Sequence, residues 1–331
     1  MEGRENILEI KDLQIGYHRK TIFAEGLSFS LFNGELTTLL GLNGIGKSTL
    51  LKTIVRLIPA INGSIMLSGK ELGKTSVSEQ AKKIAYVSTE NIQVNHLTVF
   101  ELVSQGRYPY TGWHGKLTTF DRDCVKESLS LVGLEGFHNR FINELSDGER
   151  QRAMIARAIA QDTPVIILDE PSAYLDLKNR YEVIALLHKL AHEKNKAVLF
   201  SSHDLSIVLK ETDRIILLEK AGVTIGAPED LVLNGTIDRL FVNTRISFDK
   251  QRADFVINRE FTRKVALRGN ELYCKWTENA LNRIGYCVDN QCSELIIEIK
   301  DSNEGICWEL VKKSEKKIYF TTSDLILALS K

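Results

Sequence analysis

Long apolar runs, net charge and paired cysteines are all lacking from this 331-residue sequence. No run of about 18 apolar residues occurs, which argues against a membrane-spanning helix, and the first residues lack the layout of a signal peptide. We therefore expect a soluble chain that is not exported. The 43 basic side chains balance the 43 acidic ones, so overall charge gives no reason to expect nucleic acid as a partner.

The five cysteines are an odd number and include no C-x-x-C pair. Cys287 and Cys292 are the closest pair, and no second pair of ligands accompanies them at zinc spacing. Reduced thiols are the favoured interpretation, with metal or redox use of this pair as the alternative. The composition, 43% hydrophobic and 26% charged, is that of a globular chain with room for two domains.

A glycine-rich segment is the most informative feature that is present. It reads Gly41, Leu42, Asn43, Gly44, Ile45, Gly46, Lys47, Ser48 and Thr49, which fits the pattern G-x-x-x-x-G-K-[ST]. A β-prone run, 35–40, precedes the segment, and 48–58 follows it with helical apolar spacing. The sequence therefore predicts a strand, a glycine loop and a helix.

Such a loop is suited to bind the phosphates of a nucleotide. Glycines let the backbone fold around an anion, and the N–H groups of the loop and of the helix N-terminus then point at the phosphates. Lys47 can reach the β- and γ-phosphates, and the Ser48 hydroxyl can ligate Mg²⁺. A plain glycine turn would need neither side chain, so we predict that the chain binds a nucleoside triphosphate.

Two adjacent carboxylates, Asp169 and Glu170, end the apolar run 165–168. A buried parallel strand would place them at its carboxyl end, where ligands of open α/β sheets bind. Asp169 can then meet the metal held by Ser48, and we predict that Glu170 is the base or water-orienting group of hydrolysis. A helix-capping turn is the alternative, and the glycine loop upstream favours the functional interpretation.

A third segment, 145–152, precedes a predicted helix at 153–160. Ser146 has the position of an N-cap, and its hydroxyl together with the Gly148 N–H would form a second phosphate-binding surface. Taken alone, the segment is an ordinary capping box. Its place between the other two segments favours the phosphate-binding interpretation.

These segments, in this order, resemble those of the ATP-binding subunits of ABC transporters, over about residues 5–243. Residues 41–49 are similar to the Walker A loop, 145–151 to the signature, 165–170 to the Walker B strand, 173–176 to the D-loop and 201–204 to the switch-histidine segment. Tyr17 stands where the family has its adenine-stacking aromatic residue. The resemblance implies an α/β fold: a P-loop ABC-type ATPase core with a mixed sheet and helices, plus a helical subdomain at about 91–160.

The resemblance also implies a mechanism with ATP and Mg²⁺. Two copies of the chain would face each other head to tail, with each ATP between the Walker A loop of one copy and Ser146 to Gly148 of the other. His203 would contact the γ-phosphate and act with Lys47 and Glu170, while Asp176 would shape the interface.

Two parts of the sequence depart from the family pattern. Thr89 stands where the Q-loop glutamine is usual, and Gln93 is a candidate replacement for it a few residues on. Asp147 and Glu149 stand where glycine and glutamine are common in the signature. Neither change removes the Ser146 hydroxyl or the Gly148 backbone, so we expect hydrolysis to be retained.

The resemblance further implies transport. Helices are predicted at 98–106 and 120–132, and the aromatic segment between them, 107–114, either packs locally or contacts a partner. In ABC transporters this subdomain receives the coupling helix of the membrane subunit, so a separate permease is implied, with a substrate-binding protein as an indirect partner. The expected location is then peripheral, on the cytoplasmic face of the membrane.

The stretch 106–110, the following tryptophan and the signature resemble those of importers of ferric siderophores, haem and cobalamin. Other metal or oxyanion importers stay open as alternatives. The rival function is a soluble ABC-type ATP switch in repair or translation. A single nucleotide domain, and the lack of a heptad-rich arm and of a basic tract, argue against that rival.

We predict a domain boundary between 1–244 and 245–331. The second domain is expected to be a small α+β unit, serving either regulation or dimerisation. Its predicted strands are 263–267, 294–299, 306–311 and 317–320, and its predicted helices are 270–284 and 323–329, with Thr322 as a cap.

Overall fold

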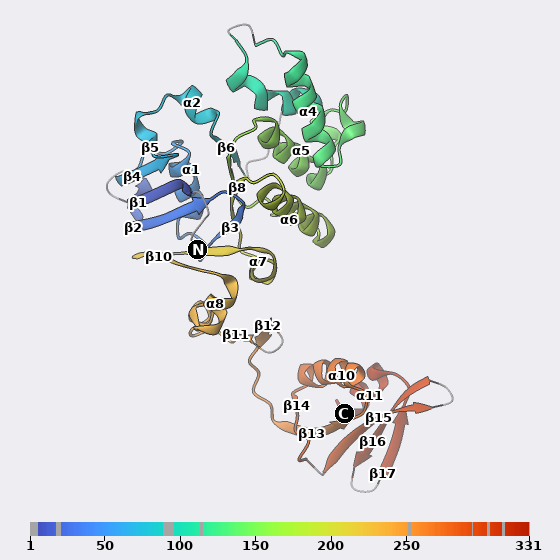
Figure 1. Cartoon of the computed structure of the whole chain (residues 1–331). Helices are drawn as coiled ribbons and strands as arrows, with labels where there is room; N and C mark the ends of the chain where they lie inside the picture. Colours follow the sequence, from blue (N-terminus) through green and yellow to red (C-terminus); the bar gives the residue numbers. More distant parts are fainter. Residues whose placement is uncertain are drawn as a thin grey trace. The chain divides into compact units, whose positions relative to one another are not determined.

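The computed structural model describes residues 6–17, 21–88, 96–112, 115–250, 253–292, 294–302, 305–312 and 315–330. The chain divides into two compact units, Met1–Leu240 and Phe241–Lys331 (Figure 1). The division falls four residues before the predicted boundary. The Q-loop positions Thr89 and Gln93, and Trp113 and His114 of the aromatic segment, lie outside the described residues.

A six-stranded sheet forms the centre of the first unit, in the order β10-β9-β3-β8-β7-β6. All of its described pairings are parallel except that of β10 with β9. The strands are β3 (Glu35–Leu40), β6 (Ile84–Val87), β7 (Val165–Leu168), β8 (Ala197–Ser201), β9 (Arg214–Glu219) and β10 (Gly222–Gly226). Every residue of β3, β7 and β8 is buried, as expected for parallel strands covered on both faces.

A second, antiparallel sheet shares a core with the first. Its order is β2-β1-β4-β5, with β1 at Asn6–Tyr17, β2 at Thr21–Phe32, β4 at Asn62–Leu67 and β5 at Lys70–Glu71. Side chains of α1 (Lys47–Ile54), among them Leu50 and Leu51, are buried in this core.

The helix predicted at 48–58 is shorter in the structure, where α1 ends at Ile54. It ends because Arg56 has a φ of 60° and the N–H groups of Leu57 and Ile58 both bond back to Lys52 O.

The helical part follows β6 and precedes β7. It contains α3 (Val99–Ser104), η2 (Gln105–Tyr110), α4 (Thr119–Leu131), η3 (Glu135–Phe137), η4 (Ile142–Glu144) and α5 (Asp147–Ala160). Capping boxes begin α3 at Thr98, α4 at Thr118 and α5 at Ser146. The predicted helix at 98–106 ends at Ser104 and continues as a 3₁₀ turn that contains Pro109.

Part of the aromatic segment packs locally. Arg107 forms a buried ion pair with Asp121, with 2.9 Å between Nε and Oδ1, and its guanidinium lies 4.1 Å from the centre of the Tyr110 ring. Tyr108, in contrast, is exposed. Local packing therefore accounts for Arg107 and Tyr110, and not for the exposed Tyr108.

Further helices accompany the sheet strands of the first unit. η1 (Leu72–Lys74) and α2 (Val77–Ala81) lead into β6, while α6 (Leu177–His192) packs on β3 and β8. The helices α7 (Leu205–Glu211), α8 (Pro228–Leu233) and α9 (Thr236–Arg239) complete this unit. In the described part of the chain we find no helix with the length and hydrophobicity needed to span a bilayer.

The second unit has the predicted α+β class. A hairpin, β11 (Ile246–Asp249) with β12 (Asp254–Ile257), precedes a five-stranded sheet in the order β14-β13-β15-β16-β17. The sheet strands are β13 (Arg263–Arg268), β14 (Tyr286–Val288), β15 (Leu295–Ser302), β16 (Gly305–Lys312) and β17 (Glu315–Tyr319), and the helices are α10 (Glu271–Arg283) and α11 (Thr322–Leu329). The hairpin and β14 were not predicted. Their short strands carry too little apolar periodicity to be distinguished from loops.

One detail of the second unit corrects the sequence prediction. The cap of α11 is Thr321 and not Thr322, because Thr321 has extended dihedral angles and its hydroxyl accepts the Asp324 N–H at 3.1 Å. Thr322 is already the first helical residue.

A buried hydrogen bond from Trp308 Nε1 to Thr277 Oγ1, 2.8 Å long, joins β16 to α10 in the core of this unit.

Candidate nucleotide-binding site

The glycine loop lies between β3 and α1, at the carboxyl edge of the parallel sheet. Gly46 is the N-cap of α1 and has a φ of 108°, which a residue with a side chain rarely adopts. A Cβ atom at this position would lie 2.9 Å from Phe23 Cβ. Glycine is therefore required at Gly46 both by the backbone turn and by the close approach of Phe23.

Lys47 is held over this loop. Its ammonium group donates to Gly41 O at 3.0 Å, and the residue is only 6% exposed. Burial lowers the pKa of Lys47, and the nearby carboxylates of Glu170 and Asp169 act in the opposite direction. A buried ammonium gains from an anionic ligand, which offsets the loss of its hydration.

A cavity of about 370 Å³ opens beside the loop. Its lining consists of Phe23, Asn43, Gly44, Gly46, Lys47, Ser48, Thr49 and Glu170. Most of the predicted loop residues thus face the same space as the predicted catalytic carboxylate. Gly41, Leu42 and Ile45 are not among the lining residues, and Leu42 is 63% exposed.

The two carboxylates meet the switch histidine at the same sheet edge. Asp169 and Glu170 follow β7, and Ser201 ends the neighbouring strand β8. The Ser201 hydroxyl donates to Asp169 Oδ1 at 2.7 Å and accepts the Glu170 N–H at 2.8 Å. His203 Nδ1 lies 3.5 Å from Glu170 Oε2. The structure therefore brings three predicted site residues together: Ser201 bonds to Asp169 and Glu170, and His203 lies beside the Glu170 carboxylate.

Oxygen ligands for Mg²⁺ are present here. A serine hydroxyl, from Ser48, and a carboxylate, from Asp169, are donors that this hard cation prefers. Within the described ranges no cluster of three or more His, Cys, Asp or Glu side chains could hold a metal. The Ser48 and Asp169 oxygens match the donor type that Mg²⁺ prefers, and a bound phosphate would supply further oxygens of the same type.

Tyr17 lies close to this cavity but not in its lining. Its ring is half exposed and meets the edge of Phe23, with 5.6 Å between the ring centres. Phe23 lines the phosphate cavity, so its ring contact places Tyr17 next to one wall of that cavity. This is an arrangement that a nucleotide base can stack on.

The signature residues and Asp176 of the D-loop do not line the cavity. They begin two helices, α5 and α6, that pack on each other through Asn179. Ser146 caps α5, and Asp176 caps α6 by accepting the Asn179 N–H at 2.8 Å. A Cβ at Gly148 would lie 2.7 Å from Asn179 Cγ, so the start of α5 packs directly on Asn179. Ser146, Gly148 and Asp176 are therefore not brought to the phosphate loop of the same chain.

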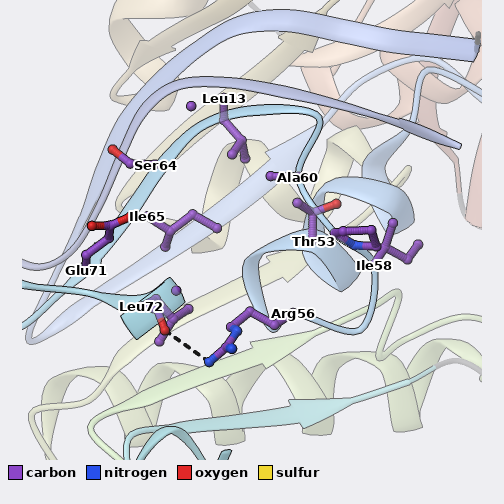
Figure 2. A pocket seen from close by; sticks show the side chains of 12 residues that line it. Leu13, Thr53, Arg56, Ile58, Ala60, Ser64, Ile65, Glu71 and Leu72 are labelled. Carbon is purple, nitrogen blue, oxygen red and sulfur yellow. Dashed lines mark hydrogen bonds between the residues drawn. The ribbon is translucent and has the colours of Figure 1, made fainter. Parts of the chain in front are cut away.

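Another pocket, of about 370 Å³, lies between the end of α1 and η1 (Figure 2). Arg56 borders it and donates to Leu72 O at 3.0 Å. None of the predicted site residues lines this pocket. It is separate from the candidate nucleotide site.

Sequence reasoning missed the separate contributions of Ser201, Phe23 and Asn179. Ser201 had one available signal, a hydroxyl at the end of an apolar run just before His203. Phe23 and Asn179 had none, because their contacts with Gly46 and Gly148 depend on the fold.

A family model described as ABC transporter matches residues 24–173. The iron(3+)-hydroxamate import ATP-binding protein FhuC of Bacillus subtilis is 39% identical over 218 residues, which are 66% of this chain and 81% of that protein. This chain belongs to the ABC transporter ATP-binding proteins. The resemblance inferred from its motifs is thereby confirmed, as is the prediction of an ATPase.

Further matches extend this ABC assignment. A family model described as the iron ABC transporter C-terminal domain matches residues 262–330. An inward-facing ABC transporter described as being of the metal-chelate type is 27% identical, with a TM-score of 0.64, and covers 76% of this chain and 96% of that one. A dimeric ATP-binding cassette solved with ADP and phosphate is also 27% identical, with a TM-score of 0.59, covering 67% and 99%. The predicted fold class and the binding of a nucleotide are confirmed.

Proposed function

We propose that this chain is the ATP-hydrolysing subunit of an importer that takes up a metal chelate, such as a ferric siderophore, haem or cobalamin, through a separate permease. One observation carries the proposal: a phosphate-loop cavity that contains Glu170 occurs in a chain whose residues 262–330 match a domain described from iron transporters. The relative from Bacillus subtilis, named for iron(3+)-hydroxamate import, supports the same class of cargo.

ATP would bind along the surface from Tyr17 to the glycine loop. The base stacks on Tyr17, and the phosphates accept the N–H groups of residues 41–49 and the Lys47 ammonium. Ser48 and Asp169 hold Mg²⁺, which neutralises phosphate charge when it is bound. Lys47 is already buried, so phosphate binding compensates the unfavourable burial of its charge.

Glu170 is our choice for the group that orients or deprotonates the attacking water. It lines the phosphate cavity, and its carboxylate is close to His203. His203 is 62% exposed at its side chain, so it is accessible to a γ-phosphate placed in the cavity. Positioned polar groups of this kind are what phosphoryl transfer to water requires.

A second copy of the chain would complete each site. Ser146, Gly148 and Asp176 lie outside the cavity of their own chain, and the dimeric cassette of 27% identity gives a precedent for pairing. Tyr174, two residues before Asp176, is 93% exposed, and Leu177, directly after Asp176, is 68% exposed. Large apolar side chains so exposed at the D-loop suit a surface that another copy covers.

The helical part would contact the permease, which places the chain at the cytoplasmic face of the membrane. Tyr108 of η2 is 59% exposed and Phe120 of α4 is 68% exposed. These side chains are candidates for that contact. A substrate-binding protein would act indirectly, by delivering cargo to the permease.

The test is capture of the Glu170→Gln chain by membranes that contain a candidate permease, with and without ATP. Glu193→Gln, an exposed substitution after α6, is the matched control. We expect both chains to be captured and only the Glu193→Gln chain to hydrolyse ATP at a rate that the permease changes. ATP-dependent dimers that bind no permease would instead support the soluble switch.

A further inference from the structure

Ser201 stands between two strands that carry the candidate ATPase site. It pairs with Leu39 of β3, the strand that leads into the glycine loop. On its other side β8 pairs with β7, which leads into Asp169 and Glu170. Ser201 is fully buried, at 0% exposure. Its hydroxyl is thus placed inside the sheet edge and not in the nucleotide cavity.

Both hydrogen-bonding functions of this hydroxyl are used by the two carboxylate residues. The O–H donates to Asp169 Oδ1 at 2.7 Å, and the oxygen accepts the Glu170 N–H at 2.8 Å. A hydroxyl has one proton to donate, so this proton is committed to Asp169. Asp169 is the residue that would hold Mg²⁺ together with Ser48, so this bond would fix the orientation of that carboxylate.

The Glu170 backbone needs such a restraint. Its φ is 46°, a left-handed conformation that residues other than glycine seldom adopt. The bond from Glu170 N–H to Ser201 fixes this peptide, and the direction of the Glu170 side chain depends on it. His203, two residues after Ser201, lies beside the Glu170 carboxylate. The Ser201 oxygen is therefore bonded both to the Asp169 carboxylate and to the backbone N–H of Glu170.

We propose that Ser201 is a positioning residue for ATP hydrolysis: its buried hydroxyl sets the Asp169 carboxylate and the Glu170 backbone in one arrangement. The proposal rests on the proposed function of the site. It assigns Ser201 no contact with the nucleotide, since Ser201 is not among the residues that line the phosphate cavity.

The experiment compares Ser201→Ala and Ser201→Thr with the full-length chain. Thr38→Val is the matched control, because Thr38 is also fully buried, lies on the adjacent strand β3, and has an Oγ1 without a hydrogen-bond partner. Steady-state ATP hydrolysis gives kcat and KM. Binding of a fluorescent ADP analogue with Mg²⁺ and with a chelator gives the gain in affinity due to the metal.

We expect Ser201→Ala to lower kcat by about 10- to 100-fold, because a small misplacement of reacting groups is costly. KM should change by less than about threefold, since the phosphate loop is untouched. The metal-dependent gain in ADP affinity should shrink, while affinity in chelator should not. Ser201→Thr retains the hydroxyl and should restore kcat, and Thr38→Val should behave as the unmodified chain.

Three results would overturn the proposal. The first is an unchanged kcat for Ser201→Ala in an active protein, which leaves the proposed function standing. The second is an equal loss in Thr38→Val, which would reflect general damage to the strands. The third is an unmodified chain that neither binds nor hydrolyses ATP, which overturns the proposed function as well. Should Ser201→Ala fail to fold, Ser201→Cys fills the site with a slightly larger side chain and a weaker donor, and it must show a loss of kcat as well.

Discussion

At the scale of single residues, the buried ammonium of Lys47 has opposite effects on two quantities. It costs stability in the protein without nucleotide, and it strengthens the binding of ATP. The Lys47 ammonium is buried, and burial lowers its pKa, so the folded protein without nucleotide holds this charge at a cost. We expect Lys47→Met to lower ATP affinity by about 100-fold, because charge-assisted bonds to phosphate are lost. The free energy of unfolding without nucleotide should fall by no more than about 1 kcal/mol.

Titration with ATP and chemical denaturation of the same samples would measure both quantities. Lys52→Met, on the same helix, is the control and should retain ATP affinity. A Lys47→Met protein that binds ATP normally would contradict the assignment of Lys47 to the phosphates.

Several residues of the candidate site stand out in the sequence because a local pattern carries their chemistry. The glycine loop combines turn, lysine and hydroxyl within nine positions, and Asp169 and Glu170 end a β-prone apolar run. Ser201 and Asn179 could not be predicted in this way. Their partners, Asp169 with Glu170 and Gly148, come near only after strands and helices have packed.

At the scale of elements, Gly106 determines how closely η2 approaches α5. A Cβ at this position would overlap the carbonyl oxygen of Arg157, which is backbone and cannot move aside. We expect Gly106→Ala to lower the free energy of unfolding by about 1–3 kcal/mol, as overpacking does. Gly112→Ala is the control because no atom lies within 4 Å of the added Cβ. Thermal unfolding would measure the difference. Equal stability of Gly106→Ala and Gly112→Ala would contradict this explanation.

An ion-pair network on the sheet of the second unit makes stability depend on pH. Lys300 and Lys316 each lie 2.6 Å from Glu309, and they lower its pKa from the ordinary 4.5 to about 2. When folding lowers the pKa of a carboxylate, that carboxylate stabilises the folded state at every pH above its pKa in the unfolded chain. That contribution is lost as the pH falls through the window from about 4.5 to about 2.

We therefore expect Glu309→Gln to lower stability at pH 7 and to flatten the loss of stability between pH 4.5 and 2. Denaturation at a series of pH values would measure this slope. Glu315→Gln, on the neighbouring strand β17, should keep the slope of the unmodified chain. Equal slopes for Glu309→Gln and the unmodified chain would show that the network does not contribute.

The sequence predicted whether an element is a helix or a strand better than it predicted where that element begins and ends. The helices near 98–106 and 120–132 and most strands of the second unit carry clear periodicity or a cap. The end of α1 depends on Arg56 adopting a positive φ, and the α11 cap shifts from Thr322 to Thr321. Two adjacent threonines offer the same hydroxyl, and only the backbone dihedral angles distinguish them.

At the scale of the whole molecule, the division at Leu240 predicts separate responses to nucleotide. ADP with Mg²⁺ at 100 times its dissociation constant should stabilise the first unit by about 2.7 kcal/mol and leave the second unchanged. In a Trp113→Phe chain the two remaining tryptophans, Trp276 and Trp308, both belong to the second unit. Their fluorescence should therefore report a transition that ADP does not shift.

Calorimetry of the same chain would follow the unfolding of the first unit. A single transition that moves as one with ADP, in heat capacity and in tryptophan fluorescence, would mean that the two units unfold together. That result would contradict independent responses.

The central claim is that ATP hydrolysis by this chain drives import of a metal chelate. The most direct measurement is the ATPase rate of the chain reconstituted with its permease and binding protein in vesicles, with and without a ferric siderophore. Our account predicts that the siderophore raises the rate, and that Glu170→Gln abolishes both hydrolysis and uptake. A rate that is the same with and without permease and cargo would contradict the account.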